Sequence, residues 1–328
     1  MSLGSDPALS GLQKIEAEMK RMRGDAAQTF AANEAMAARV AGTIRDTGRL
    51  LLLGMGGSHW ANRTAHFAYR RLGVDVQTEV ISETLLAPPP KLRRTVLLTS
   101  QSGDSVEIVK YLQEPAPHEQ RFGLTLNSDG ALARSVPSLI AAGGMERAFA
   151  ATRSIVLSHV MHLSVLGALG ADAAASLAAL GPEDSQISDD MIRILSNCQT
   201  LIFTGRTELV GLAESAALAF DGGQLRHGPL EMLSEQTGVV ALTSAGPASA
   251  LDAALIDACR NAGAPMIVFD ATGHAPATAD RVTRPTASGY AAVMALLPAL
   301  LRLIVSVAAT LVPDVGEPLR CSKVTLDQ

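Results

Sequence analysis

The chain of 328 residues is poor in charged side chains, in aromatic side chains and in cysteine. Charged residues make up 18% of it and aromatic residues 3%, and the formal net charge is −5. Because a nucleic-acid-binding surface needs a surplus of basic residues, we expect no nucleic-acid partner. With few aromatic residues and abundant alanine, helices in the core should pack closely through small side chains.

The three cysteines, Cys198, Cys259 and Cys321, lie too far apart for a CxxC or Cys/His zinc pattern. We therefore expect no metal site, and reduced, buried thiols of this kind are typical of a cytoplasmic protein. Residues 1–26 are polar with helical periodicity and contain no apolar signal core. Together these features predict a cytoplasmic location.

Two long apolar stretches, residues 155–180 and 291–312, need an interpretation because about 20 apolar residues can span a bilayer. The first contains His159 and His162, and the second is interrupted by Pro298 and Arg302. We interpret both stretches as buried core helices and expect no membrane partner. The two histidines could form a metal pair, but structural roles are favoured.

An internal repeat organises the chain. Short apolar runs at 50–53, 95–100 and 122–127 recur in the same order at 201–204, 239–244 and 266–270. Such runs, with helical patterns between them, are typical of buried parallel strands joined by right-handed crossovers. The predicted fold is α/β, with two tandem doubly wound parallel sheets of the flavodoxin-like or Rossmann-like kind. We expect an N-terminal helical segment at 1–36 and domains at 37–182 and 183–328.

In such sheets ligands bind beyond the carboxyl ends of the strands, so the loops after the strands are where the chemistry should lie. The loop after the predicted strand at 95–100 is rich in hydroxyls and contains Ser100, Gln101, Ser102, Gly103, Asp104 and Ser105. Hydroxyls and N–H groups around a glycine can hold a phosphate without Lys or Arg. The alternative is an ordinary serine N-cap, but a cap needs only one hydroxyl.

A second loop, residues 54–59, contains Gly56, Gly57 and Ser58 and precedes a predicted helix, whose N-terminus suits a phosphate. It fits a dinucleotide fingerprint poorly because His59 stands where a third glycine belongs, so an oxidoreductase is a weaker hypothesis. No P-loop motif occurs in the sequence. A structural turn is the alternative for this loop.

These two loops resemble those of the sugar isomerase (SIS) domain family. Two SIS domains in tandem resemble the isomerase half of glutamine–fructose-6-phosphate aminotransferase and the related sugar-phosphate deaminases and deglycases. The resemblance implies a phosphorylated sugar as the ligand. It implies that the phosphate is held around Gly57, Ser58, Ser100, Gln101, Ser102 and Ser105.

A looser match at 146–153 implies that Ala151 and Thr152 line the sugar pocket, with Ala151 replacing a serine. Residues 223–231, GQLRHGPLE, resemble a segment whose histidine opens the sugar ring and reaches the site from a neighbouring subunit. His227 takes this role by resemblance, which implies a homodimer. The alternative for His227 is a surface or capping histidine.

The base that moves the C-2 proton is assigned to Glu231 in preference to Asp221, although both remain candidates. Asp221 replaces a glutamate of the related family, and Leu218 replaces a lysine there. The C-terminal residues 314–325 resemble a segment whose lysine forms a Schiff base with a keto sugar, which assigns this role to Lys323. The alternatives are a first-turn helix glutamate for Glu231 and a solvated charge for Lys323.

No glutaminase domain precedes the tandem domains, so we do not expect the full synthase activity. The sequence instead predicts an isomerase, deaminase or deglycase acting on a hexose or amino-hexose 6-phosphate through an enediol or enediolamine. Acid–base residues suffice for that chemistry, so we expect no cofactor. The alternative from another class is a sensor module that binds a sugar phosphate without catalysis.

Overall fold

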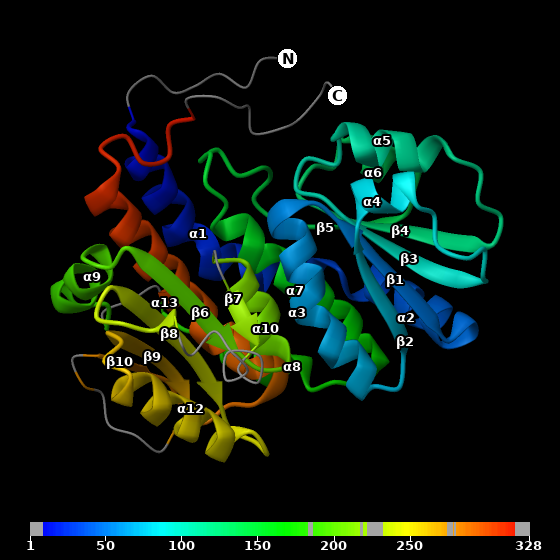
Figure 1. Ribbon diagram of the computed structural model, residues 1–328. Helices are drawn as coiled ribbons and strands as arrows, with labels where there is room; N and C mark the ends of the chain where they lie inside the picture. Colours follow the sequence, from blue (N-terminus) through cyan, green and yellow to red (C-terminus); the bar gives the residue numbers. More distant parts are fainter. Residues whose placement is uncertain are drawn as a thin grey trace.

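The computed structural model describes residues 9–182, 186–216, 219–221, 232–273, 278 and 280–318, with residues 219–221 described by their backbone alone. Two five-stranded sheets with parallel pairing throughout form its framework, and helices cover their faces (Figure 1). The fold class predicted from the sequence is confirmed.

The first sheet has the strand order β2-β1-β3-β4-β5. The second sheet, read from β7, has the order β7-β6-β8-β9-β10, which is the same order shifted by five. The first sheet consists of β1 (Arg49–Gly54), β2 (Asp75–Val80), β3 (Arg94–Thr99), β4 (Glu119–Thr125) and β5 (Ser138–Ile140). The second consists of β6 (Thr200–Gly205), β7 (Ala219–Asp221), β8 (Thr237–Ser244), β9 (Met266–Ala271) and β10 (Arg281–Thr283). This shared topology confirms the internal repeat.

The three central strands of each sheet coincide with the apolar runs that the sequence predicts. The strands at the edges were not predicted, because they lack such runs. In β2 only Val76 is fully buried, while β5 and β10 have three residues each. A continuous apolar run identifies only a strand that is buried on both faces.

The helices before residue 183 are α1 (Gly11–Ala32), α2 (Glu34–Thr47), α3 (Gly56–Arg71), α4 (Ile81–Leu86), α5 (Val106–Gln113), α6 (Ala131–Ser135), α7 (Arg153–Leu169) and α8 (Ala173–Ala178). Those after it are α9 (Asp189–Ser196), α10 (Glu208–Glu214), α12 (Ser249–Asn261) and α13 (Gly289–Leu311). The apolar stretch at 155–180 is thus two helices, because Gly170 (φ +117°) ends α7 and Asp172 caps α8.

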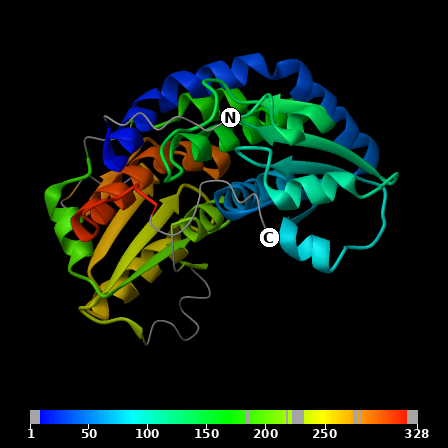
Figure 2. The ribbon, with the colours of Figure 1, turned by 90° about the horizontal axis from the view of Figure 1, so that it is seen from above.

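One apolar core joins the two halves. A single cluster of buried side chains extends from Ile15 on α1 through Val156 on α7 to Leu300 on α13. Figure 2 shows α1 and α2 running along one side of the molecule, from the end of α13 to the first sheet. The N-terminal segment therefore packs against both halves, and the boundary predicted at residue 37 falls inside α2.

Helix α13 is long and apolar enough to cross a membrane by length and composition alone. In its most apolar stretch of 18 residues, however, 72% of the residues are buried inside the protein. The helix packs against α9, α10, α8 and β9, with Pro298 inside it. These contacts support the interpretation of α13 as a core helix.

The two repeats differ in backbone strain at the first loop. Gly56, two residues after β1, has φ +50°, and the matching residue two after β6 is Thr207, with φ +52° and ψ −121°. Thr207 is the only non-glycine residue with positive φ in the described part of the chain. A β-branched residue is strained in this conformation, whereas a glycine is not.

Replacing Thr207 by glycine should therefore stabilise the protein. Removing roughly 1–3 kcal/mol of strain outweighs the ~0.5–1 kcal/mol that glycine costs through the unfolded chain, for a net gain of about 1 kcal/mol. Urea unfolding measures the change. Thr43→Gly in the interior of α2 is the control and should destabilise, whereas a loss of stability in Thr207→Gly would contradict the prediction.

Candidate functional site

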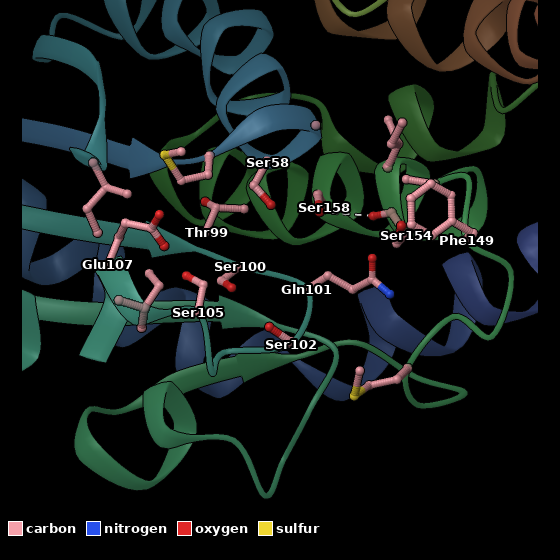
Figure 3. Close-up of a pocket in the computed structure, with 17 residues that line it drawn as sticks. Ser58, Thr99, Ser100, Gln101, Ser102, Ser105, Glu107, Phe149, Ser154 and Ser158 are labelled. Atoms are coloured by element: carbon pink, nitrogen blue, oxygen red, sulfur yellow. Dashed lines mark hydrogen bonds between the residues drawn. The ribbon is translucent and has the colours of Figure 1, made fainter. Parts of the chain in front are cut away.

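A cavity of about 260 Å³ opens at the carboxyl end of the first sheet. Gly54 at the end of β1 pairs with Thr99 at the end of β3, so the loops that follow these strands begin side by side. Figure 3 shows hydroxyl side chains from the first turn of α3, from the loop after β3 and from α7 surrounding the cavity. The lining residues used below are Gly57, Ser58, Thr99, Ser100, Gln101, Ser102, Ser105, Glu107, Ala151, Ser154 and Ser158.

The structure thus gathers seven of the predicted binding residues around one cavity: Gly57, Ser58, Ser100, Gln101, Ser102, Ser105 and Ala151. Thr152 lies behind the wall instead of lining it. Its side chain is buried, and its hydroxyl donates to Glu146 Oε1 over 2.8 Å.

The loop at 100–105 is held in shape by its own hydrogen bonds and by residues 125–132, which end β4 and begin α6. Gly103 has φ +69°, which favours glycine, and a Cβ there would lie only 3.1 Å from Cβ of Leu132, a tight contact. The carboxylate of Asp104 accepts the N–H of Ala131 over 2.7 Å and an amide N–H of Asn127 over 3.1 Å. Asp104 therefore anchors the loop and is not free to face the ligand.

The hydroxyls of this loop are poised to donate. Ser100 Oγ accepts the N–H of Gly103 and Ser102 Oγ accepts the N–H of Asp104, over 3.1 and 3.2 Å. Neither hydroxyl donates to another described residue, nor do those of Ser58 and Ser105. Ser105 occupies the N-cap position of α5 but makes no side-chain capping bond. Its hydroxyl remains available, which weakens the interpretation of the loop as a simple cap.

Hydroxyls on the α7 side of the cavity have the opposite polarity. Ser154 Oγ donates to Glu146 Oε2, and Ser158 Oγ donates to the carbonyl of Ser154 over 2.9 Å. Their protons are committed, so toward a ligand these oxygens can only accept. The cavity therefore has a donor end, formed by Ser58 and the loop at 100–105, and an acceptor side on α7.

Charge in the cavity is sparse. Among the described lining residues Glu107, in the first turn of α5, is the only one with an ionisable side chain, and none is a lysine or arginine. An anion bound at the donor end would thus be held by hydroxyls, by N–H groups and by the N-terminus of α5. Backbone N–H groups of Gln101, Ser102 and Ser105 donate to no other described residue.

The start of α7 is capped by a buried glutamate. Glu146 Oε1 accepts the N–H groups of Thr152 and Arg153, over 2.9 and 2.8 Å, and Glu146 Oε2 accepts the N–H and hydroxyl of Ser154. A carboxylate at a helix N-terminus satisfies free N–H groups and the helix dipole. Glu146 thereby sets the position of Ser154 and of the segment that includes Ala151.

Arg153 ties this wall to the N-terminal helix. Its side chain is fully buried, and its Nε and Nη1 atoms pair with Glu18 and Asp25 of α1, over 2.5 and 3.0 Å. Its guanidinium also donates to the carbonyls of Ala142 and Gly144. Glu18 and Asp25 lie seven residues apart, two turns along one face of α1. That spacing is visible in the sequence, but nothing in it points to Arg153 as the partner.

The two histidines of α7 are each hydrogen-bonded to a tyrosine. His159 Nδ1 lies 2.8 Å from the hydroxyl of Tyr290, and His162 Nδ1 lies 3.2 Å from that of Tyr69. Burial lowers the pKa of each histidine to about 3, so both are neutral at ordinary pH. No group of three metal-ligating side chains occurs among the residues that the structure describes.

The proposed catalytic residues lie outside this geometry. His227, Glu231 and Lys323 fall outside the described residues, and Asp221 is described only as the last backbone position of β7. Of the predicted site residues, the described lining of the cavity therefore contains only those assigned to ligand binding, and the residues assigned to the chemistry remain predictions.

The chain is similar in sequence to aminotransferases of known function. No protein-family model matches the chain. Glutamine–fructose-6-phosphate aminotransferase (isomerizing) of Rhizobium meliloti is 25% identical over 248 residues, which are 65% of this chain and 38% of that protein. The protein of the same name from Treponema pallidum is 25% identical over 67% of this chain and 40% of its own length. The chain thus spans about two fifths of these relatives.

Solved structures share the fold over almost the whole chain. The C-terminal domain of glucosamine-fructose-6-phosphate aminotransferase from Francisella tularensis superposes with a TM-score of 0.78 at 16% identity, covering 93% of this chain and 98% of its own. The resemblance to the SIS family is confirmed. Tagatose-6-phosphate ketose/aldose isomerase from Escherichia coli has a TM-score of 0.75 at 17% identity, with 92% and 95% of the two chains covered. Glucosamine-6-phosphate deaminase from Thermotoga maritima has a TM-score of 0.68 at 16% identity, with 92% of this chain and 99% of that chain covered. Below 25% identity, these structures establish the SIS fold.

Arg153→Met should destabilise the protein by about 3–5 kcal/mol, because the buried carboxylates of Glu18 and Asp25 lose their buried counter-charge and keep only the half-exposed Arg21. Thermal and urea unfolding measure the loss. Adding Glu18→Gln and Asp25→Asn to Arg153→Met should restore part of the stability, since the only charge that then loses its partners is the half-exposed Arg21. A loss below ~1 kcal/mol, the usual range for an exposed ion pair, would show that the pairs are not buried in solution.

Proposed function

We propose that this chain is a sugar-phosphate isomerase or deaminase that acts on a hexose or amino-hexose 6-phosphate. The observation that carries the proposal is the separation of polarity in the cavity. Four hydroxyls with uncommitted protons face one end, and hydroxyl oxygens that can only accept lie on α7. A phosphate monoester needs donors, whereas sugar hydroxyls can use acceptors.

The phosphate would bind at Ser58 and the loop at 100–105, with the N-terminus of α5 beneath it. The sugar would extend toward Ala151 and α7. A volume of about 260 Å³ suits a small, polar ligand of this kind. The relatives named for tagatose 6-phosphate and glucosamine 6-phosphate support the same ligand class.

The chemistry would begin with ring opening by His227, contributed from the neighbouring subunit of a cytoplasmic homodimer. Glu231, or Asp221 in its place, would move the C-2 proton through an enediol or enediolamine. Lys323 would form an imine at the carbonyl of a ketose. Isomerisation returns an aldose or ketose, while deaminase and deglycase reactions also release an amine.

Ser105→Ala tests the donor end. Unfolding stability should change by less than ~0.5 kcal/mol, because Ser105 makes no capping bond. Affinity for a sugar 6-phosphate should fall by about 1.5–3 kcal/mol, which is tenfold or more in Kd, because one hydrogen bond to a charged group is lost. Calorimetric titration measures this change.

The matched control is Ser188→Ala, because Ser188 caps α9 by accepting the N–H of Met191. It should lose about 1 kcal/mol of stability and no affinity. Unchanged affinity in Ser105→Ala would remove that hydroxyl from the binding model.

Proton NMR in heavy water tests the reaction itself with fructose 6-phosphate, glucosamine 6-phosphate and fructosamine 6-phosphate. Loss of the C-2 proton signal, or a new aldose or ketose, is expected with one of them and should disappear in His227→Ala. Ammonia or free amine would identify a deaminase or deglycase. Binding without proton exchange for every sugar would contradict catalysis and favour a sugar-phosphate sensor.

A further inference from the structure

Behind the cavity, one oxygen atom joins three of its walls. Asn62 Oδ1 on α3 lies 2.7 Å from Thr99 Oγ1 at the end of β3 and 2.9 Å from His162 Nε2 on α7. Asn62, Thr99 and His162 are at most 1% exposed. Tyr69, also on α3 and fully buried, places its hydroxyl 3.2 Å from His162 Nδ1. We call these four residues the Asn62 hub.

The direction of each hydrogen bond in the hub follows from its members. Burial keeps His162 neutral, so its ring has one donor and one acceptor. In the orientation that the structure gives the Asn62 amide, Oδ1 faces both partners and can only accept, so His162 donates from Nε2 and Thr99 donates its hydroxyl proton. His162 Nδ1 is then the acceptor for the Tyr69 hydroxyl. The chain therefore has one consistent polarity, from Tyr69 through His162 to Asn62. Asn62 Nδ2 is buried and has no hydrogen-bond partner among the described residues.

On each of the three elements, a hub residue lies one position or one helical turn away from a serine that lines the cavity. On α3, Asn62 follows Ser58 by four residues, which places both on one face of the helix. On α7, His162 continues the row of Ser154 and Ser158 at the same spacing of four. Thr99 directly precedes Ser100 and itself lines the cavity (Figure 3).

We propose that the Asn62 hub holds the three serine-bearing walls of the cavity at the spacing that a phosphorylated ligand requires. Its members are positioning residues: Asn62 fixes the start of α3 against the end of β3, and His162 fixes both against α7. The proposal deepens the function proposed above and rests on it for the nature of the ligand. A misplacement of one wall by about an ångström would be enough to weaken binding strongly.

A matched pair of tyrosines allows a direct test. Tyr69 and Tyr290 are both buried, and each places its hydroxyl against Nδ1 of a histidine on α7. Only His162, the partner of Tyr69, reaches Asn62; His159, the partner of Tyr290, is bonded to Tyr290 alone among the described residues. Phenylalanine at either position removes one buried hydroxyl that contacts a histidine of α7, and the hydroxyl of Tyr290 also donates to the carbonyl of His159.

Calorimetric titration with inorganic phosphate and with glucosamine 6-phosphate, beside urea unfolding, distinguishes positioning from general stability. In Tyr69→Phe the affinity should fall roughly tenfold, and in Tyr290→Phe it should stay within twofold. Stability should fall at least as much in Tyr290→Phe as in Tyr69→Phe, because the Tyr290 hydroxyl makes two hydrogen bonds. Equal affinities in the two variants would overturn the proposal, because the hub would then contribute to stability only.

Thr99→Val and Thr99→Ser provide a second test at the cavity itself. Valine removes the bond to Asn62 without changing the shape, and we expect a loss of affinity of roughly tenfold or more. Serine keeps the hydroxyl and should retain the affinity. Wild-type affinity in Thr99→Val would overturn the hub proposal alone. A wild-type protein that binds neither phosphate nor glucosamine 6-phosphate would overturn the proposed function as well.

Discussion

The buried guanidinium of Arg153 is the constraint on which the first half of the molecule depends. A charge with no solvent exposure is tolerated only where opposite charges and hydrogen-bond acceptors surround it. Glu18 and Asp25 provide the charges, and the carbonyls of the segment at 142–144 provide the acceptors. Helix α1 must therefore lie against α7, and the segment that leads to Ala151 must wrap around the same side chain. The N-terminal helix α1 and the segment that leads to the wall of the cavity are thus both bonded to the guanidinium of Arg153.

The donor end of the cavity, in contrast, contains neutral groups and, among the described residues, no buried cation. This end relies on hydroxyls, N–H groups and a helix N-terminus, and the hub behind it is a chain of neutral groups. Neutral donors in a fixed arrangement hold an anion without the desolvation cost of a buried arginine or lysine. The affinity for an anion then depends on where the donors lie. The spacing of the three walls is therefore the property that we propose the Asn62 hub controls.

The two repeats share one topology but differ in the loops that follow their strands. In the first repeat the loop after β1 contains a glycine with positive φ, and the loop after β3 presents free hydroxyls. In the second, the strained Thr207 replaces that glycine, and Ser249 holds the loop after β8 closed by bonding its backbone. Asp270, at the end of β9, pairs with Arg281 over 2.6 Å. Burial alone would raise the pKa of Asp270, but hydrogen bonds from Thr272 and Arg281 outweigh it and lower that pKa. The polar groups of this region are thus used within the protein.

The sequence by itself determined the repeat, the central strands and the serine-rich loop, because continuous burial and local loop chemistry leave marks over a few adjacent residues. It missed the edge strands, which are only partly buried, and it placed Thr152 in the pocket although its hydroxyl bonds to Glu146. Only the tertiary structure decided which hydroxyl protons are free and which are committed. It also decided that Arg153 meets Glu18 and Asp25, and that Asn62 meets His162 a hundred residues away. Contacts of this kind depend on how separate elements pack, and no local pattern in the chain encodes them.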